Sequence, residues 1–208
     1  MDKLTIALAK GRLAEDGLKL FEKNDLVPII DKESRKLKFT NNEKNITFIF
    51  VKPSDVVTYV EKGVADIGIV GKDVLLESES DVYEIMDLGF GKCKFSIAGF
   101  KDQSIFKKNE VLKIASKYPN YVYKIFKERD QKIEVIQLNG SVELAPIMGL
   151  ADVIVDIVQT GSTLEANDLV VLEDLEDISA RLIANKVSYR FKFGIIEQIE
   201  EILGGKIK

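Results

Sequence analysis

The segment from Asp156 to Leu164 has the residue types needed to bind a phosphorylated sugar. An apolar run, Val153 to Val158, contains one acid and is followed by the loop Thr160-Gly161-Ser162-Thr163. A carboxylate within a buried strand requires a partner. A glycine between hydroxyl residues, just before a helix, exposes several N–H groups that suit a phosphate. The segment therefore predicts a phosphate on the loop and ribose hydroxyls on Asp156.

The same residues also fit a helix start that binds nothing. Ser162-Thr163-Leu164-Glu165 matches a capping box, in which Ser162 and Glu165 satisfy the first helix amides. Helix starts of this composition are common, so the nine residues alone leave both interpretations open.

Cations follow two other predicted strands and could complement polyphosphates. Lys10-Gly11-Arg12 follows the apolar run Leu4 to Ala9, where Gly11 permits a tight turn and Arg12 offers a bidentate fork. Lys52-Pro53-Ser54 likewise stands between a strand and a helix. Each has a simpler explanation: a solvated basic loop for the first and Ser54 as a helix N-cap for the second.

Two further charged residues are candidates with simple alternatives. Arg35 lies in the charged stretch from Asp31 to Lys38, where a solvated loop is the default. Glu143 follows Asn139-Gly140-Ser141 in the first turn of a predicted helix, a position that the helix dipole alone favours for acids.

The absence of histidine excludes several kinds of chemistry. With no His among 208 residues, Ser-His-Asp triads, His-ligated zinc and imidazole proton transfer are ruled out. Cys93 has no His to activate it and is expected to be a buried strand residue. Chemistry must then rely on charged groups, hydroxyls and backbone amides, which favours electrostatic positioning of phosphates.

Two glycine patterns fail as nucleotide-binding motifs. Gly68-Ile69-Val70-Gly71-Lys72-Asp73 resembles a P-loop, but Asp66 stands in place of the first Gly and Asp73 in place of the Ser/Thr. Gly89-Phe90-Gly91 has Lys94 where a dinucleotide-binding fingerprint needs its third glycine.

The bulk composition indicates a soluble globular protein with a small-molecule ligand. Hydrophobic residues make up 46% of the chain, charged residues 31%, and the net charge is −4 with no basic excess, so a nucleic-acid partner is not expected. No apolar run approaches the ~18–20 residues of a membrane span. Met1-Asp2-Lys3 leads directly into a strand, not a signal peptide. One cysteine indicates the reducing cytoplasm.

Short apolar strands alternate with amphipathic helices, which predicts an α/β fold. The expected strands are Leu4–Ala9, Leu37–Thr40, Ile46–Phe50, Asp66–Val70, Tyr83–Leu88, Phe95–Phe100, Ile133–Leu138, Val153–Val158 and Leu169–Leu175. Val111 to Arg129 is expected to be mostly helical, and the tail is a helix that ends at Gly204-Gly205. We expect two lobes, residues 1–89 plus 178–208 and residues 90–177.

Read in order, these segments resemble the short form of ATP phosphoribosyltransferase. Its most specific match is Glu143-Leu-Ala-Pro-Ile-Met-Gly-Leu-Ala-Asp-Val-Ile-Val-Asp156, which continues through Leu164. The other matches are Ala9-Lys10-Gly11-Arg12-Leu13, Ser34-Arg35-Lys36-Leu37, Lys52-Pro53-Ser54-Asp55-Val56 and Gly63-Val-Ala-Asp66-Ile-Gly68-Ile-Val-Gly71-Lys-Asp73. Lys52 stands where the family usually has Arg before Pro53, which keeps the charge but not the bidentate geometry.

The resemblance implies the first step of histidine biosynthesis. In this reaction N1 of the ATP adenine joins C1′ of phosphoribosyl pyrophosphate (PRPP), with Mg²⁺ as cofactor, and pyrophosphate leaves. It further implies a two-lobed, periplasmic-binding-protein-like (type II) architecture with the active site in the cleft between the lobes. The chain would form a homodimer and work with a regulatory subunit that resembles histidyl-tRNA synthetase, since the short form lacks the C-terminal regulatory domain.

The resemblance also implies roles for individual residues. Arg12 and Arg35 would be catalytic and stabilise charge on the departing pyrophosphate. The PRPP-binding residues would be Glu143, Asp156, Thr160, Gly161, Ser162, Thr163 and Leu164. The residues for ATP and pyrophosphate would be Lys10, Gly11, Lys52, Pro53, Ser54, Gly71 and Asp73. Which acids hold Mg²⁺ is left open, because PRPP can itself supply most ligands.

Two other functions stay open at this stage. One is a non-enzymatic solute-binding or sensor module of the same two-lobed shape. The other is a phosphoribosyltransferase for a free nucleobase, although such enzymes usually carry two adjacent acids before the phosphate loop, where this chain has Asp156 alone.

Overall fold

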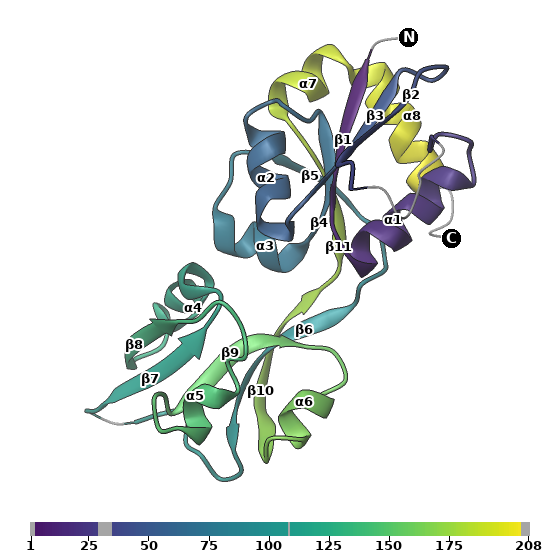
Figure 1. The fold of residues 1–208 in the computed structure, drawn as a ribbon. Helices are drawn as coiled ribbons and strands as arrows, with labels where there is room; N and C mark the ends of the chain where they lie inside the picture. The colour runs from purple at the N-terminus through teal and green to yellow at the C-terminus, as the bar shows by residue number, and fades with distance from the viewer. Residues whose placement is uncertain (1–2, 29–34, 108, 205–208) are drawn as a thin grey trace. The chain divides into compact units, whose positions relative to one another are not determined.

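The chain folds into two compact units, which are shown in Figure 1. The computed structural model describes residues 3–28, 35–107 and 109–204; Ser34 and Gly205, which belong to sequence patterns above, lie outside the described residues. Unit 1 comprises Met1–Gly91 and Ser179–Lys208, and unit 2 comprises Lys92–Ile178.

Unit 1 is built on a six-stranded mixed sheet of order β2-β3-β1-β4-β11-β5. The strands are β1 (Leu4–Ala9), β2 (Lys38–Asn41), β3 (Ile46–Val51), β4 (Ile67–Gly71), β5 (Tyr83–Asp87) and β11 (Ala180–Ala184). The three neighbours β3, β1 and β4 are parallel, whereas β2, β11 and β5 pair antiparallel to their neighbours. The carboxyl ends of the parallel strands therefore meet at one edge of the sheet.

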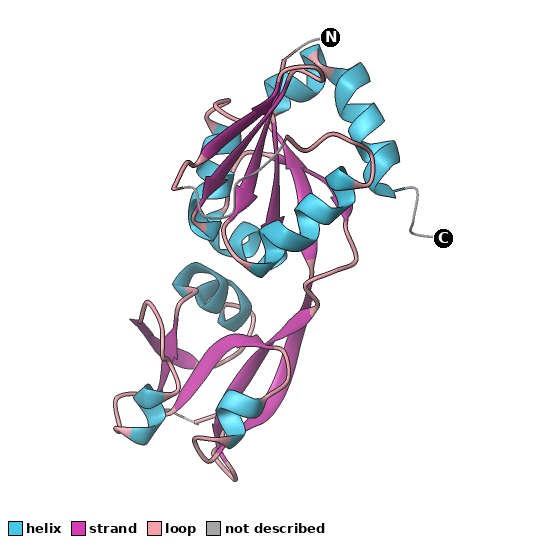
Figure 2. Cartoon of the chain, turned by 45° about the vertical axis from the view of Figure 1, so that its right-hand side comes forward, coloured by secondary structure: helices cyan, strands magenta, loops and turns pink. Residues whose placement is uncertain are grey.

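Helices flank this sheet on both faces (Figure 2). They are α1 (Arg12–Glu22), α2 (Pro53–Glu61), α3 (Lys72–Ser78), α7 (Lys186–Phe191) and α8 (Phe193–Gly204). The side chains of strand β1 contact helices on both faces of the sheet. Leu4, Ile6 and Leu8 pack with α1 and α8, whereas Ala7 and Ala9 pack with α2. A strand covered on both sides has a nearly continuous apolar sequence.

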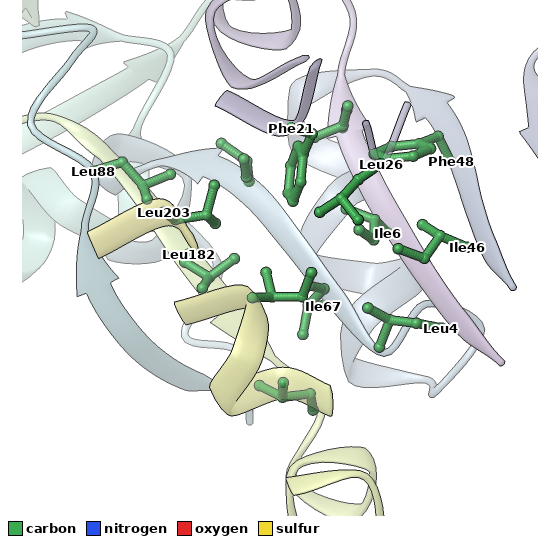
Figure 3. Packing of buried hydrophobic residues seen from close by; sticks show 14 of the residues in the cluster. Leu4, Ile6, Phe21, Leu26, Ile46, Phe48, Ile67, Leu88, Leu182 and Leu203 are labelled. Atoms are coloured by element: carbon green, nitrogen blue, oxygen red, sulfur yellow. The ribbon is translucent and has the colours of Figure 1, made fainter. Parts of the chain in front are cut away.

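Aromatic residues fill the centre of the core on the α1 side. Phe21 of α1 meets Phe48 of β3 edge-on, with ring centroids 5.4 Å apart, and Ile6 and Leu26 lie beside them (Figure 3). Edge-to-face pairs of this kind add to the stabilisation from apolar burial.

A buried carboxylate joins the C-terminal helices to the sheet of unit 1. Asp66 is 6% exposed and accepts hydrogen bonds from the Thr5 N–H at 2.8 Å and the Ser188 hydroxyl at 2.6 Å. Lys192, between α7 and α8, contacts both of its carboxylate oxygens at 2.9 Å. Because a buried charge is stable only when paired and hydrogen-bonded, Asp66 has a structural role.

Unit 2 has a five-stranded mixed sheet of order β10-β6-β9-β7-β8. Its elements are β6 (Cys93–Phe100), β7 (Val111–Ser116), α4 (Pro119–Phe126), β8 (Lys132–Gln137), α5 (Leu144–Ile147), β9 (Val153–Val158), α6 (Ser162–Glu165) and β10 (Leu169–Ile178). β9, β7 and β8 are parallel, and β10, β6 and β9 are antiparallel. Both units thus confirm the α/β class.

An ion pair fixes the start of β9 against β7. Asp152 accepts hydrogen bonds from the Lys107 ammonium at 2.7 Å and from the Lys113 N–H at 2.8 Å. Burial by itself would raise the pKa of the Asp152 carboxyl, but these two hydrogen bonds outweigh it and lower the pKa below the ordinary value.

The structure corrects part of the expected secondary structure. Val111–Ser116 is the strand β7 and not helix: Leu112 is buried between the exposed Val111 and Lys113, and the helix α4 begins only at Pro119. The strand β11 and the helix α7 were not expected, and β10 continues to Ile178. Cys93 is a strand residue, as expected, but it is half-buried.

Candidate active site

The loop after β9 forms the first part of the candidate site. Gly161 adopts a left-handed conformation, with φ 77°, and the helix α6 begins at the next residue. The hydroxyls of Thr160 and Ser162 lie 3.0 Å apart. The Glu165 N–H donates to the Gly161 carbonyl at 3.0 Å, which closes the first turn. The loop therefore turns sharply at a position where only glycine is unstrained.

The capping box considered for this loop is not formed. The N-cap residue of α6 is Gly161 and not Ser162, and within the described chain no side chain caps this helix. Ser162 instead occupies the first helical position, and its N–H faces the Thr160 hydroxyl at 3.4 Å. The Ser162 and Glu165 side chains therefore do not cap the helix in the way that the helix-start interpretation requires.

One cavity of about 220 Å³ in unit 2 gathers residues from three separate segments. All seven residues expected to bind PRPP line it: Glu143, Asp156, Thr160, Gly161, Ser162, Thr163 and Leu164. It is also lined by Ser96, Ala98, Ile154 and 157–159. The cavity combines two carboxylates with a loop of hydroxyls and amides.

The two acids reach this cavity from different elements. Asp156 lies on β9 and is half-buried, although the strand was expected to be buried. One of its carboxylate oxygens accepts a hydrogen bond from the Ile157 N–H at 2.9 Å. Glu143 occupies the N-cap position of α5, one residue before its first turn, and is half-buried. The buried Val142 and Ala145 on either side hold this segment in the core.

A second, larger cavity of about 550 Å³ adjoins the same loop. Its polar lining includes Lys94 of β6 and Asp174 of β10, whose ammonium and carboxylate lie 2.9 Å apart. Ser96 lines both cavities and donates a hydrogen bond to Asp174 at 2.9 Å. Sequence reasoning missed these three residues, because their strands join the site only through sheet pairing.

The candidates from unit 1 lie along the edge where β3, β1 and β4 end. Lys10 follows β1, and its N–H donates to the Val51 carbonyl of β3 at 2.8 Å. Gly11, with φ 103°, forms the turn into α1, and Arg12 is the exposed first residue of that helix. The φ of Gly11 explains why glycine is required between the two cations.

Lys52, Pro53 and Ser54 lie at the end of the neighbouring strand β3. The N-cap residue of α2 is Lys52, followed by Pro53 at the first helical position, so the interpretation of Ser54 as the N-cap is wrong. The Ser54 hydroxyl instead donates to the Asp55 carboxylate at 3.2 Å. All three candidates are exposed.

Gly71 and Asp73 complete this edge at the end of β4. The Asp73 carboxylate folds back over Gly71, so that a Cβ at Gly71 would lie 2.1 Å from Asp73 Oδ1. Lys72 between them forms an ion pair with Glu84 of β5. The lysine of the apparent P-loop is therefore committed within the fold, which agrees with the rejection of that motif.

Arg35 lies ahead of β2 and is exposed. Because β2 runs antiparallel to β3, with Lys38 opposite Ile49, the residues before β2 approach the carboxyl end of β3. The structure therefore brings the candidates of unit 1 to one sheet edge and those of unit 2 to one cavity.

The described residues offer neither a cluster of metal ligands nor a membrane-spanning helix. Within the described ranges, no three or more Cys, Asp or Glu side chains lie close enough together to hold a metal ion by themselves. No described helix is both long enough and apolar enough to cross a membrane.

Comparisons with known proteins agree over nearly the whole chain. The family model for ATP phosphoribosyltransferase matches residues 52–205. An ATP phosphoribosyltransferase of Clostridioides difficile (strain 630) is 63% identical over 203 residues, 98% of this chain and 96% of the relative. That of Oceanobacillus iheyensis is 52% identical and covers 96% of each chain.

Solved structures are similar in fold. The ATP phosphoribosyl transferase (HisG:HisZ) complex from Thermotoga maritima matches with a TM-score of 0.85 and 36% identity over 97% of each chain. The periplasmic aliphatic sulphonate binding protein SsuA from Escherichia coli matches with a TM-score of 0.64 and 15% identity, over 98% of this chain and 72% of that chain. The second match concerns the fold alone and confirms the periplasmic-binding-protein-like type.

Proposed function

The chain belongs to the ATP phosphoribosyltransferase family, and from this membership we infer that it catalyses the first step of histidine biosynthesis. The reaction joins N1 of the ATP adenine to C1′ of PRPP and releases pyrophosphate. The observation that carries the site assignment is that all seven expected PRPP-binding residues line one cavity.

We propose that the loop after β9 holds the 5′-phosphate of PRPP. The amides and hydroxyls of Thr160 to Thr163 surround the turn at Gly161, which suits an anion. Leu164 is buried beneath them and anchors the helix α6 in the core. Asp156 then accepts hydrogen bonds from the ribose hydroxyls, and Glu143 lies on the same cavity.

We propose that the cations of unit 1 act on the phosphates of the same two substrates. Arg12 and Arg35 neutralise the negative charge that grows on the departing pyrophosphate. Lys10 and Lys52 attract the ATP polyphosphate, while Gly11, Pro53, Ser54, Gly71 and Asp73 shape the sheet edge that carries them. Lys52 acts as a point charge, since it lacks the fork of an arginine.

This arrangement suits a displacement at C1′ that needs no acid–base residue. The bond between C1′ and the pyrophosphate oxygen breaks with its electron pair on pyrophosphate, and adenine N1 forms the new bond. C1′ becomes cationic on the way, so positioning and neutralisation of the leaving group supply the acceleration. A chain without histidine can perform both tasks.

The two acids of the cavity fit Mg²⁺ as the cofactor. Mg²⁺ is usually held by one or two carboxylates together with substrate phosphates, and Glu143 and Asp156 provide such a pair. When bound, the ion would neutralise charge on pyrophosphate. The oxygens of PRPP would complete its ligands, in keeping with the absence of a larger acidic cluster among the described residues.

We also propose the assembly implied by the family. The Thermotoga maritima neighbour is a complex of HisG with HisZ, and we propose that this chain forms a homodimer and binds a regulatory subunit resembling histidyl-tRNA synthetase. Its place of action would be the cytoplasm, where a lone thiol such as Cys93 stays reduced.

Pyrophosphate release from ATP and PRPP with Mg²⁺ tests this function, with the chain assayed alone and as purified with its partner. We expect release to require both substrates and to yield a phosphoribosyl adduct of ATP. Release with a free nucleobase in place of ATP would favour the other type of phosphoribosyltransferase. Ligand binding without release in either preparation would favour a solute-binding module.

A further inference from the structure

Ser96 lies in the middle of a polar row that crosses three strands of unit 2. It is directly opposite Asp174 in the pairing of β6 with β10 and directly opposite Asp156 in the pairing of β6 with β9. Residues opposite each other in neighbouring strands share a face of the sheet. The row therefore ends at the acid that we assign to the ribose hydroxyls.

Ser96 is buried yet reaches the cavity. It is 1% exposed, and it lines the 220 Å³ cavity together with Asp156 and the phosphate loop. Its hydroxyl donates to Asp174 Oδ1 at 2.9 Å, and Lys94 donates to the other oxygen of that carboxylate at 2.9 Å. A hydroxyl has one hydrogen and two acceptor lone pairs, and an ionised carboxylate only accepts.

The charge state of Asp174 fixes the direction of this hydrogen bond. The hydrogen bond from Lys94, followed by that from Ser96, lowers the pKa of the Asp174 carboxyl below its ordinary value, so it is ionised at neutral pH. The single hydrogen of Ser96 is therefore committed to Asp174. What Ser96 offers to the cavity is an acceptor.

We propose that Ser96 determines specificity for the sugar by accepting a hydrogen bond from a ribose hydroxyl of PRPP, with Asp174 and Lys94 as positioning residues. This inference rests on the proposed function, which places the ribose at Asp156. A vicinal diol supplies two donors, and the Asp156 carboxylate and Ser96 Oγ supply acceptors on one face. A sugar that lacks the hydroxyl leaves a buried acceptor unpaired, which selects against it.

Substitutions at two positions of the row, Ser96 and Asp174, test this. Ser96→Ala removes the acceptor, and we expect the KM for PRPP to rise about 5- to 10-fold, the value of one neutral hydrogen bond. The KM for ATP should stay within about two-fold. The preference for PRPP over its 2-deoxy or 3-deoxy analogue, measured as kcat/KM, should fall by the same factor for one of the two analogues.

Asp174→Asn should reverse the polarity of Ser96 without touching the substrate. The Lys94 ammonium keeps the amide oxygen of Asn on its side, so the amide NH₂ faces Ser96, which then accepts and turns its hydrogen toward the cavity. We expect a similar rise in the KM for PRPP. In the double variant the Asp174→Asn change should add nothing to Ser96→Ala, a non-additivity that a general loss of structure would not produce.

Ser116→Ala is the matched control. Ser116 is a buried serine of the neighbouring strand β7 that donates to the Val155 carbonyl at 2.6 Å, so its loss should lower the melting temperature and leave the KM for PRPP unchanged. An unchanged KM and sugar preference in Ser96→Ala, or additive effects in the double variant, would overturn the inference. If Asp156→Asn also leaves the KM for PRPP unchanged, the proposed site itself is wrong.

Discussion

Replacement of Gly161 by alanine tests whether the shape of the loop after β9 binds substrate. Gly161 has φ 77° and ψ −3°, and a Cβ built on it has no heavy atom within 4 Å. Gly161→Ala therefore introduces no clash and acts through backbone strain alone, about 1–2 kcal/mol for an L-residue in the left-handed region. Relief of this strain turns the amides of Thr160 to Thr163 away from the phosphate position.

The expected kinetic effect follows from that strain. If PRPP binds only the left-handed loop, about 1–2 kcal/mol corresponds to a KM for PRPP that is about 5- to 30-fold higher. The KM for ATP should change little, because the ATP residues lie in unit 1. The assay is pyrophosphate release at varied PRPP and saturating ATP, together with urea unfolding.

Gly149 provides the matched control in the same unit. It has φ +70°, a Cβ there also has no heavy atom within 4 Å, and it does not line the 220 Å³ cavity. Gly149→Ala should thus lose a similar amount of unfolding free energy and keep its KM for PRPP. Equal KM values in both variants and the unchanged protein would refute the assignment of the loop to PRPP.

Three further predictions concern turnover, stability and pH. Arg12→Ala should lower turnover about 10³-fold, by analogy with phosphoryl-transfer arginines, and leave the melting temperature nearly unchanged. The control Arg190→Ala should keep its kcat, and an unaltered kcat in Arg12→Ala would contradict the role of Arg12. Asp66→Ala should lower the unfolding free energy by about 2–5 kcal/mol, because it leaves the Thr5 N–H and the Ser188 hydroxyl without their acceptor and removes the charge partner of the half-buried Lys192. Asp81→Ala, which breaks an exposed ion pair, should cost less than about 1 kcal/mol, and similar urea midpoints for the two variants would disprove this. Asp152 has a lowered pKa in the folded state, so its stabilisation is complete above the unfolded pKa of about 3.9 and is lost as the pH falls through the folded pKa. The unfolding free energy should therefore decline below about pH 4, less steeply in Asp152→Asn, and equal slopes would show that this carboxylate contributes nothing.

Local patterns were enough to predict most of the strands. Leu4–Ala9 and Val153–Val158 are strands with the predicted bounds, since a six-residue run with a single polar member, bounded by polar loops, is typical of a buried strand. Val111–Ser116 was predicted as helix because short apolar runs do not distinguish a buried strand from a helix. Its place between β9 and β8 decides the outcome, and that is a tertiary effect.

The candidate site was predictable only where its residues are close in sequence. The run from Asp156 to Leu164 lines one cavity, and so does Glu143, a candidate whose role came from the family resemblance. Ser96 and Asp174 were missed because 78 residues separate them along the chain and only the β10-β6-β9 pairing brings them beside Asp156. The alternating pattern of β6 predicts which of its residues share a face, but not which strands flank it.

A crystal structure of the enzyme with PRPP and Mg²⁺ would show directly where the phosphorylated sugar binds. We expect the 5′-phosphate within hydrogen-bond distance of the amides of Gly161 to Thr163, and the ribose hydroxyls on the carboxylate of Asp156. PRPP bound elsewhere, with no contact to this loop or to Asp156, would show that the assignment of the cavity is wrong.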